Sequence, residues 1–162
     1  PRDPLLPLFQ HNVNVDGPLV EAPLITIACC RSGDKGDAAN CGLLARQEKY
    51  YGFLAQHMTE GVVLQHLEMW HNSRGQSVGS VIDQGGPDAT KCQRFPLYQS
   101  WGFNFVLTKV LGGGGLMSLK GDKQGKSIGS ILLTMRLPIP QAWVDEYNVG
   151  VGALKGQLRS QL

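Results

Sequence analysis

The chain has 162 residues, enough for one domain with a hydrophobic core. Hydrophobic residues make up 42% and charged residues 17%, a composition typical of globular rather than disordered proteins. The net charge of +2, with no stripe of lysine and arginine, argues against nucleic-acid binding. No apolar run approaches the ~18–20 residues that span a bilayer. We therefore expect a cytoplasmic protein that binds neither nucleic acids nor membranes.

The cysteines and the C-terminus bear on cofactors and compartment. The cysteines show no CxxC spacing and no paired-histidine partner motif, so we expect no metal site and no cofactor. Cysteines used as small apolar residues in a reducing compartment fit this pattern. The last residues, Ser160-Gln161-Leu162, resemble a peroxisomal Ser-Lys-Leu signal except for the glutamine. A peroxisome-like organelle is the alternative compartment.

The N-terminal quarter of the chain predicts an arm followed by strands. Residues 1–23 contain five prolines and no hydrophobic periodicity, which predicts an extended arm. The apolar, β-branched run Leu24–Cys30 predicts a strand in the middle of a sheet. A charged loop over residues 31–37 follows, and residues 40–46 form a second strand or a helix.

Two amphipathic helices are predicted next. Apolar side chains repeat every fourth residue over Tyr50–Met58, which marks one helix face. Thr59 is suited to cap a second helix, whose buried stripe spans Val63–Trp70. Residues 72–93 are mostly polar and predict a long loop, with a short strand at Val78–Ile82.

The second half predicts a helix, a hairpin and a short helix. Apolar spacing predicts a helix over Phe103–Val110, ended by the four glycines at 112–115. Alternation over Leu116–Lys120 and Ser127–Leu137 predicts an antiparallel hairpin with one buried face. After two prolines, residues 141–147 predict a short helix.

Together these elements predict an α+β fold, an antiparallel sheet with helices packed on one face. Arg94-Phe95-Pro96 marks the end of a further strand. We expect the domain to span residues 24–140, between the arm and a C-terminal tail of residues 141–162.

Two charged, glycine-rich loops predict a functional face. Gly33–Gly36 and Gly121–Gly125 each follow a predicted strand. Glycine lets backbone N–H groups point into a common hollow and lysine adds positive charge, so such loops suit a phosphate or carboxylate. The same residues also make ordinary hairpin turns, and neither loop has phosphate-loop spacing. The aspartates of the first loop could hold a divalent cation, although internal ion pairs with neighbouring basic residues fit them better.

The segment Arg31-Ser32-Gly33-Asp34-Lys35-Gly36-Asp37, with Asn40 and Gly42, resembles the opening signature of the AtuA-like family, named for acyclic terpene utilisation. Further segments match in the family's order: Arg94–Leu97, Asn104-Phe105, Leu111–Gly114, Ser118-Leu119, Asp122 and Gly125-Lys126. The resemblance implies a ferredoxin-like fold for this domain, which in longer relatives follows a much larger N-terminal domain. It also implies an association with the catabolism of branched acyclic terpenoids through their CoA thioesters.

The sequence leaves two functions open. We expect a stand-alone AtuA-like domain that serves as a subunit or interaction module, forming a homo-oligomer or joining a separately encoded larger AtuA-like subunit. The alternative is a small enzyme or binding protein for an anionic metabolite such as an acyl-CoA, with Asp34 as candidate acid or base. The predicted ligand-binding residues are shared by both: Arg31, Ser32, Gly33, Asp34, Lys35, Gly36, Asp37, Asn40, Asn104, Asp122 and Lys126.

Overall fold

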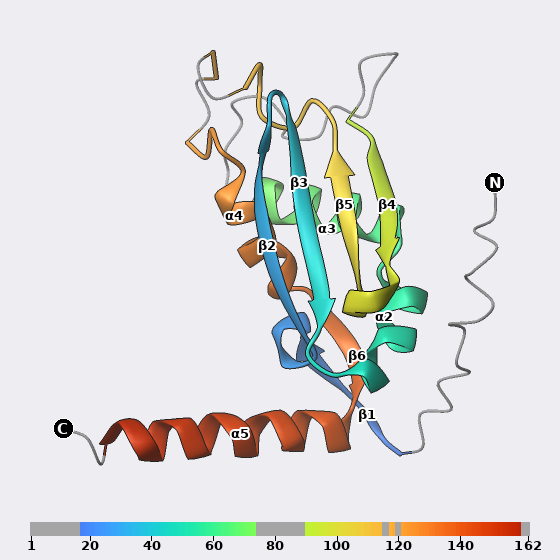
Figure 1. The fold of residues 1–162 in the computed structure, drawn as a ribbon, viewed down its shortest axis with the longest axis vertical. Helices are drawn as coiled ribbons and strands as arrows, with labels where there is room; N and C mark the ends of the chain where they lie inside the picture. Colours follow the sequence, from blue (N-terminus) through green and yellow to red (C-terminus); the bar gives the residue numbers. More distant parts are fainter. Residues whose placement is uncertain (1–16, 74–89, 115–116, 119–120, 160–162) are drawn as a thin grey trace.

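The computed structural model describes residues 17–73, 90–114, 117–118 and 121–159 (Figure 1). Its strands are β1 Leu19–Pro23, β2 Ala28–Lys35, β3 Ala38–Ala45, β4 Cys92–Leu97, β5 Gly102–Leu107 and β6 Arg136–Pro140. Its α-helices are α2 Tyr51–His57, α3 Glu60–Ser73, α4 Lys126–Leu133 and α5 Gln141–Arg159. Short 3-10 turns are η1 Leu24–Thr26, η2 Glu48–Tyr50 and η3 Tyr98–Ser100.

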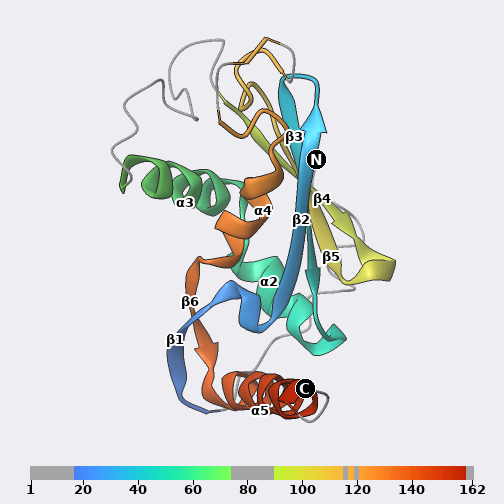
Figure 2. The same cartoon turned by 90° about the vertical axis from the view of Figure 1, so that its left-hand side faces the viewer.

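The centre of the fold is a four-stranded antiparallel sheet in the order β2-β3-β5-β4, and β1 pairs with β6 in a separate two-stranded sheet. Helices α3 and α4 lie on one side of the four strands (Figure 2). The opposite side carries no described helix. The predicted α+β fold, with helices packed on one face of an antiparallel sheet, is confirmed.

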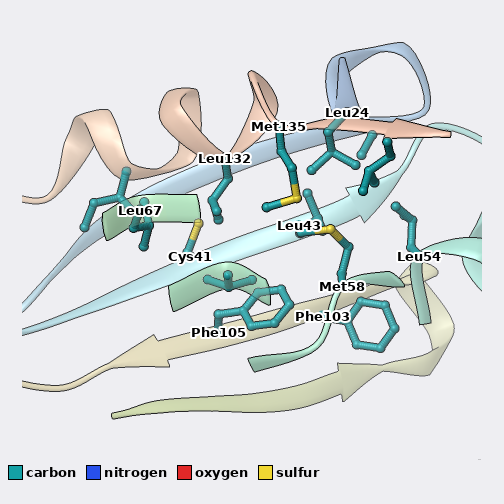
Figure 3. Close-up of a cluster of buried hydrophobic side chains, with 14 of the residues drawn as sticks. Leu24, Cys41, Leu43, Leu54, Met58, Leu67, Phe103, Phe105, Leu132 and Met135 are labelled. Carbon is teal, nitrogen blue, oxygen red and sulfur yellow. The ribbon is translucent and has the colours of Figure 1, made fainter. Parts of the chain in front are cut away.

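Residue alternation explains which face is covered. Every second residue of β3 and β5 is buried without any exposed surface: Ala39, Cys41, Leu43, Phe103, Phe105 and Leu107. Side chains between them point to the other face, because successive strand residues alternate. Figure 3 shows the buried set meeting side chains of the covering elements, among them Met58, Leu132 and Met135. Each such large apolar side chain contributes about 1.5–3 kcal/mol on burial.

Two elements of the second half correct the prediction. Phe103–Val110 is not a helix, because Gly102–Leu107 forms strand β5 in the middle of the sheet. The predicted strand over residues 127–137 is instead helix α4 followed by the start of β6. The pair Ile128 and Leu132, four residues apart, supplies the buried face of α4.

The first half is closer to the prediction. Strand β3 and helices α2 and α3 form where expected, and the Val62 N–H donates to Thr59 Oγ1 at 3.3 Å, which is the predicted cap. The predicted strand at Leu24–Cys30 begins later, at Ala28, and β2 continues through most of the predicted loop. It lies at the edge of the four-stranded sheet, and not in its middle as predicted. The predicted short strand at Val78–Ile82 lies outside the described residues. In the predicted first strand of the hairpin, Leu116–Lys120, the described residues Met117 and Ser118 turn back to hydrogen-bond to the Gly114 carbonyl oxygen.

Helix α5 is longer than the predicted segment 141–147 and runs on to Arg159. Figure 1 shows its first half under the body and its second half projecting beyond it. Glu146 fixes the first half, because its carboxylate accepts hydrogen bonds from Gln47 Nε2 (2.7 Å), Lys49 Nζ (2.6 Å) and Tyr50 Oη (3.1 Å).

Candidate functional site

Ser32 joins strand β2 to the start of α4. Its Oγ lies 2.5 Å from the carbonyl oxygen of Gly125 and 3.2 Å from that of Lys126, and it accepts a hydrogen bond from the Gly129 N–H at 2.9 Å. A Cβ on Gly129 would come within 3.3 Å of the Arg31 backbone, so glycine permits this close approach. The two glycine-rich segments of the sequence are therefore in direct contact.

Asp122 caps the N-terminus of α4. Its Oδ1 accepts a hydrogen bond from the Lys126 N–H at 2.9 Å, and its Oδ2 accepts from the Ser127 N–H and hydroxyl at 2.7 and 2.6 Å. Burial alone would raise the pKa of Asp122, but the hydrogen bonds from Ser127, Lys126 and the Gln124 N–H outweigh it and lower the pKa. The ionised carboxylate therefore stabilises the fold.

Replacing Asp122 with alanine is expected to lower the free energy of unfolding by about 1 kcal/mol at pH 7. Because the folded pKa is depressed, this contribution is present above the unfolded pKa and is lost as pH falls through the folded pKa. Urea unfolding at pH 7 and pH 3 measures it. The difference between wild type and Asp122→Ala should shrink at pH 3, whereas Asp34→Ala, at an exposed carboxylate, should stay close to wild type at both pH values.

Asp37 holds the glycine turn at residues 112–114 against the end of β2. Its carbonyl oxygen accepts hydrogen bonds from the N–H groups of Val110–Leu111, both at 3.1 Å, and its Oδ1 accepts from the Gly113 N–H at 2.7 Å. Gly114 has φ +86°, and a Cβ there would lie 2.9 Å from the Gly36 carbonyl oxygen. Ser32, Asp37 and Asp122 thus bind backbone groups and hold the neighbouring candidate residues in place.

Other candidate residues meet on the face of the sheet turned away from the helices, which we call the open face. Strand pairing places Arg31 of β2 opposite Gly42 of β3, and Gly42 opposite Asn104 of β5. Gly33 lies opposite Asn40. On β5, Asn40 is opposite Val106 and Gly42 is opposite Asn104, so the two asparagines are diagonal neighbours on adjacent strands. Neither asparagine side chain hydrogen-bonds to another described residue.

The side chain of Lys126 extends from the start of α4 to the open face. Its Nζ lies 3.1 Å from the point where a Cβ on Gly33 would stand, and Asn40 Oδ1 lies 3.9 Å from that point. The missing side chain at Gly33 therefore leaves room for the lysine amine beside the carboxamide. Arg31, Asn40, Asn104 and Lys126, far apart in sequence, share one region.

The remaining predicted residues lie at the end of the β2–β3 hairpin. Gly36, at φ +67°, makes the turn, and Lys35 shares the open face with Arg31. Asp34 occupies the alternate position, on the other side of β2 from Arg31. It is exposed, and its role as acid or base stays a prediction.

The prediction overlooked two exposed apolar residues of β4. The open face carries Phe95, 48% exposed, opposite Asn104, and Leu97, 38% exposed, opposite Gly102. The alternation Gln93-Arg94-Phe95-Pro96-Leu97 was the available signal, because it turns both apolar side chains to the same face.

A close pair of thiols, Cys41 buried and Cys30 half-buried, was also overlooked. Cys30 Sγ and Cys41 Sγ lie 3.1 Å apart beneath the helices. The hydrogen bond with Cys30 and burial both raise the pKa of Cys41 well above its usual value, and burial raises the pKa of Cys92 to about 12. The thiols of Cys41 and Cys92 are therefore protonated at neutral pH and are poor nucleophiles.

The architecture, an antiparallel sheet covered on one face, defines an α+β domain of ferredoxin-like type. The family model described as AtuA ferredoxin-like domain matches residues 22–138. The chain belongs to this family. No curated protein and no solved structure matches it. Within the described ranges, no helix is long and apolar enough to cross a membrane, and no group of three His, Cys, Asp or Glu side chains is arranged to hold a metal.

Proposed function

We propose that the domain is an assembly subunit, and that its open face docks on a larger protein surface carrying apolar side chains flanked by carboxylates. As that partner we propose the large domain that precedes the ferredoxin-like domain in the longer AtuA-like proteins, supplied by the same or by another chain. The observation that carries the proposal is the combination of exposed apolar and basic side chains on one uncovered sheet face.

An apolar strip crosses the open face along one row of paired residues. Leu97 pairs with Gly102, which pairs with Leu44. The Leu44 Cδ2 atom stands 2.5 Å from the position of a Cβ on Gly102, so the leucine covers the glycine and continues the strip. Phe95 adjoins it in the next row. Exposed aromatic side chains of this kind are enriched in the cores of protein interfaces.

Charge favours an unlike partner over a second copy. The charged side chains that β2–β5 turn to the open face are Arg31 and Lys35, both basic, and Lys126 adds its amine from α4. Asp34 lies on the other side of β2. Two such faces packed together would oppose like charges, whereas carboxylates on a partner would be attracted.

The edge strand β4 is protected against pairing with another strand. Pro96 has no N–H to donate, and the Arg94 N–H donates to Glu60 Oε1 at 3.3 Å. Binding through the face of the sheet rather than along the edge of β4 is therefore favoured.

Light scattering of the chain mixed with the purified large domain of a longer relative tests the proposal. A one-to-one complex is expected, and Phe95→Asp should weaken it at least tenfold, because a buried carboxylate would face the apolar core of the interface. Met69→Asp is the matched control, since Met69 is 56% exposed but lies on α3 in the helix layer.

Each other outcome counts against the proposal. A chain that stays monomeric with the large domain overturns it. A homodimer that Phe95→Asp dissociates, with no binding to the large domain, assigns the face to a second copy instead. Equal loss of binding in Phe95→Asp and Met69→Asp would also overturn it.

A further inference from the structure

The geometry points to a small-molecule site on the open face, beside the apolar strip: a glycine-floored surface patch that binds an organic oxyanion, a carboxylate or phosphate joined to an apolar body. This site shares Arg31, Lys126 and Phe95 with the proposed protein interface, so a docked partner would cover it. Its floor is the backbone at Gly33 and Gly42, and its rim is Arg31, Asn40, Asn104 and Lys126.

The base of the site is formed by two glycines, which place no side chain of their own over the sheet. Gly42 stands between Arg31 and Asn104 in one row, and the nearest atom to a Cβ there would be the Arg31 carbonyl oxygen at 3.8 Å. Gly33 lies in the next row, opposite Asn40. Neither glycine has positive φ, so neither is required by a turn. At Gly42 the missing side chain lets a ligand approach the backbone closely, and at Gly33 it makes room for the Lys126 amine.

The rim supplies donors that suit an oxyanion. Arg31 offers a planar guanidinium that can bind two oxygens at once, and the Lys126 amine stands above Gly33. Asn40 and Asn104 each add a carboxamide N–H₂. None of the four side chains hydrogen-bonds to another described side chain, and the four strands turn no carboxylate to this face. A negative ligand group therefore meets only attractive charge.

The surroundings indicate that the oxyanion carries an apolar body. Val106 lies opposite Asn40, and Phe95 lies opposite Asn104, so apolar side chains border the rim on the β4 side. An oxyanion held over the glycines would place its substituent along these two residues. An inorganic anion would leave that apolar surface uncovered.

Calorimetric titration of the whole chain with hexanoate, hexyl phosphate, acetate and inorganic phosphate tests the inference. We expect hexanoate to bind at least tenfold more tightly than acetate, or hexyl phosphate to bind at least tenfold more tightly than inorganic phosphate. The hexyl compound that binds more tightly identifies the head group as a carboxylate or a phosphate. Failure of both hexyl compounds to bind at millimolar concentration overturns the inference. If hexanoate binds no more tightly than acetate, and hexyl phosphate no more tightly than inorganic phosphate, the inference that the ligand has an apolar body is overturned.

Substitutions separate this site from general charge and from the interface. Arg31→Gln and Gly42→Ala should each weaken binding at least tenfold, the first by removing charge and the second by filling the floor. Lys49→Gln removes the same charge from an exposed residue beside α5, where it pairs with Glu146, and should bind like wild type. Thermal unfolding midpoints close to that of wild type establish that the variants fold. Unchanged affinity in Arg31→Gln, or equal loss in Lys49→Gln, overturns the site. Gly42→Ala removes no side chain of the interface, so its complex with the large domain should form as in wild type.

Discussion

Replacing Gly102 with alanine is expected to lower the free energy of unfolding by about 3 kcal/mol or more, a cost typical of severe overpacking. A Cβ at this position would stand 2.3 Å from the Leu43 carbonyl oxygen and 2.5 Å from Leu44 Cδ2. The first contact is with backbone in the middle of the sheet, so relief requires β3 and β5 to move apart. Urea unfolding followed by circular dichroism measures the loss.

Gly61→Ala is the matched control for that substitution. Gly61 lies in α3, and no atom stands within 4 Å of the position of its Cβ. Alanine should leave stability within about 1 kcal/mol of wild type, on the stabilising side, because it favours the helix. Equal stability of the Gly102 and Gly61 variants would contradict the close packing of β3 on β5.

Phe103→Ala is expected to cost about 3–5 kcal/mol, as large-to-small changes in a core do. The ring of Phe103 is fully buried and stacks on Tyr51 with centroids 5.1 Å apart. The Arg94 guanidinium lies 4.9 Å from its centroid. That half-buried arginine would lose this contact, keeping its hydrogen bonds to the carbonyl oxygens of Ala55 and Met58.

The control for Phe103 lies on the neighbouring strand. Phe95→Ala removes the same ring from the open face, where it is 48% exposed, and should change stability by less than about 0.5 kcal/mol. A loss in Phe95→Ala as large as that in Phe103→Ala would mean that the two faces of the sheet are equally buried. Chemical unfolding of both variants under one condition decides the point.

Much of the first half of the fold could be predicted from local patterns. Helix α3 has both a capping residue, Thr59, and a buried stripe, so two independent signals agree. The second half was misread because short apolar runs fit helix and strand spacing equally well. In Phe103–Val110 the alternation of Phe103, Phe105 and Leu107 decides for a strand, yet Val106 and Val110 also fit a helix.

The candidate site was predictable in its parts but not in its arrangement. The charged, glycine-rich composition of residues 31–37 and 121–126 indicated a functional face, and these segments do meet through Ser32. The open face depends on the pairing of β3 with β5, whose residues are about sixty positions apart in sequence. No local signal sets that register, so the joining of Asn40 to Asn104 and the exposure of Phe95 required the structure.

The thiol of Cys29 tests most directly whether the open face is the docking surface. Cys29 is exposed there, opposite Leu44 at one end of the apolar strip. Its alkylation rate, followed by mass spectrometry with and without the large domain, should fall at least tenfold in the complex. A cysteine introduced by Met69→Cys on α3 should react equally fast in both states. An unprotected Cys29 within a stable complex, or protection of position 69 instead, would contradict docking through this face.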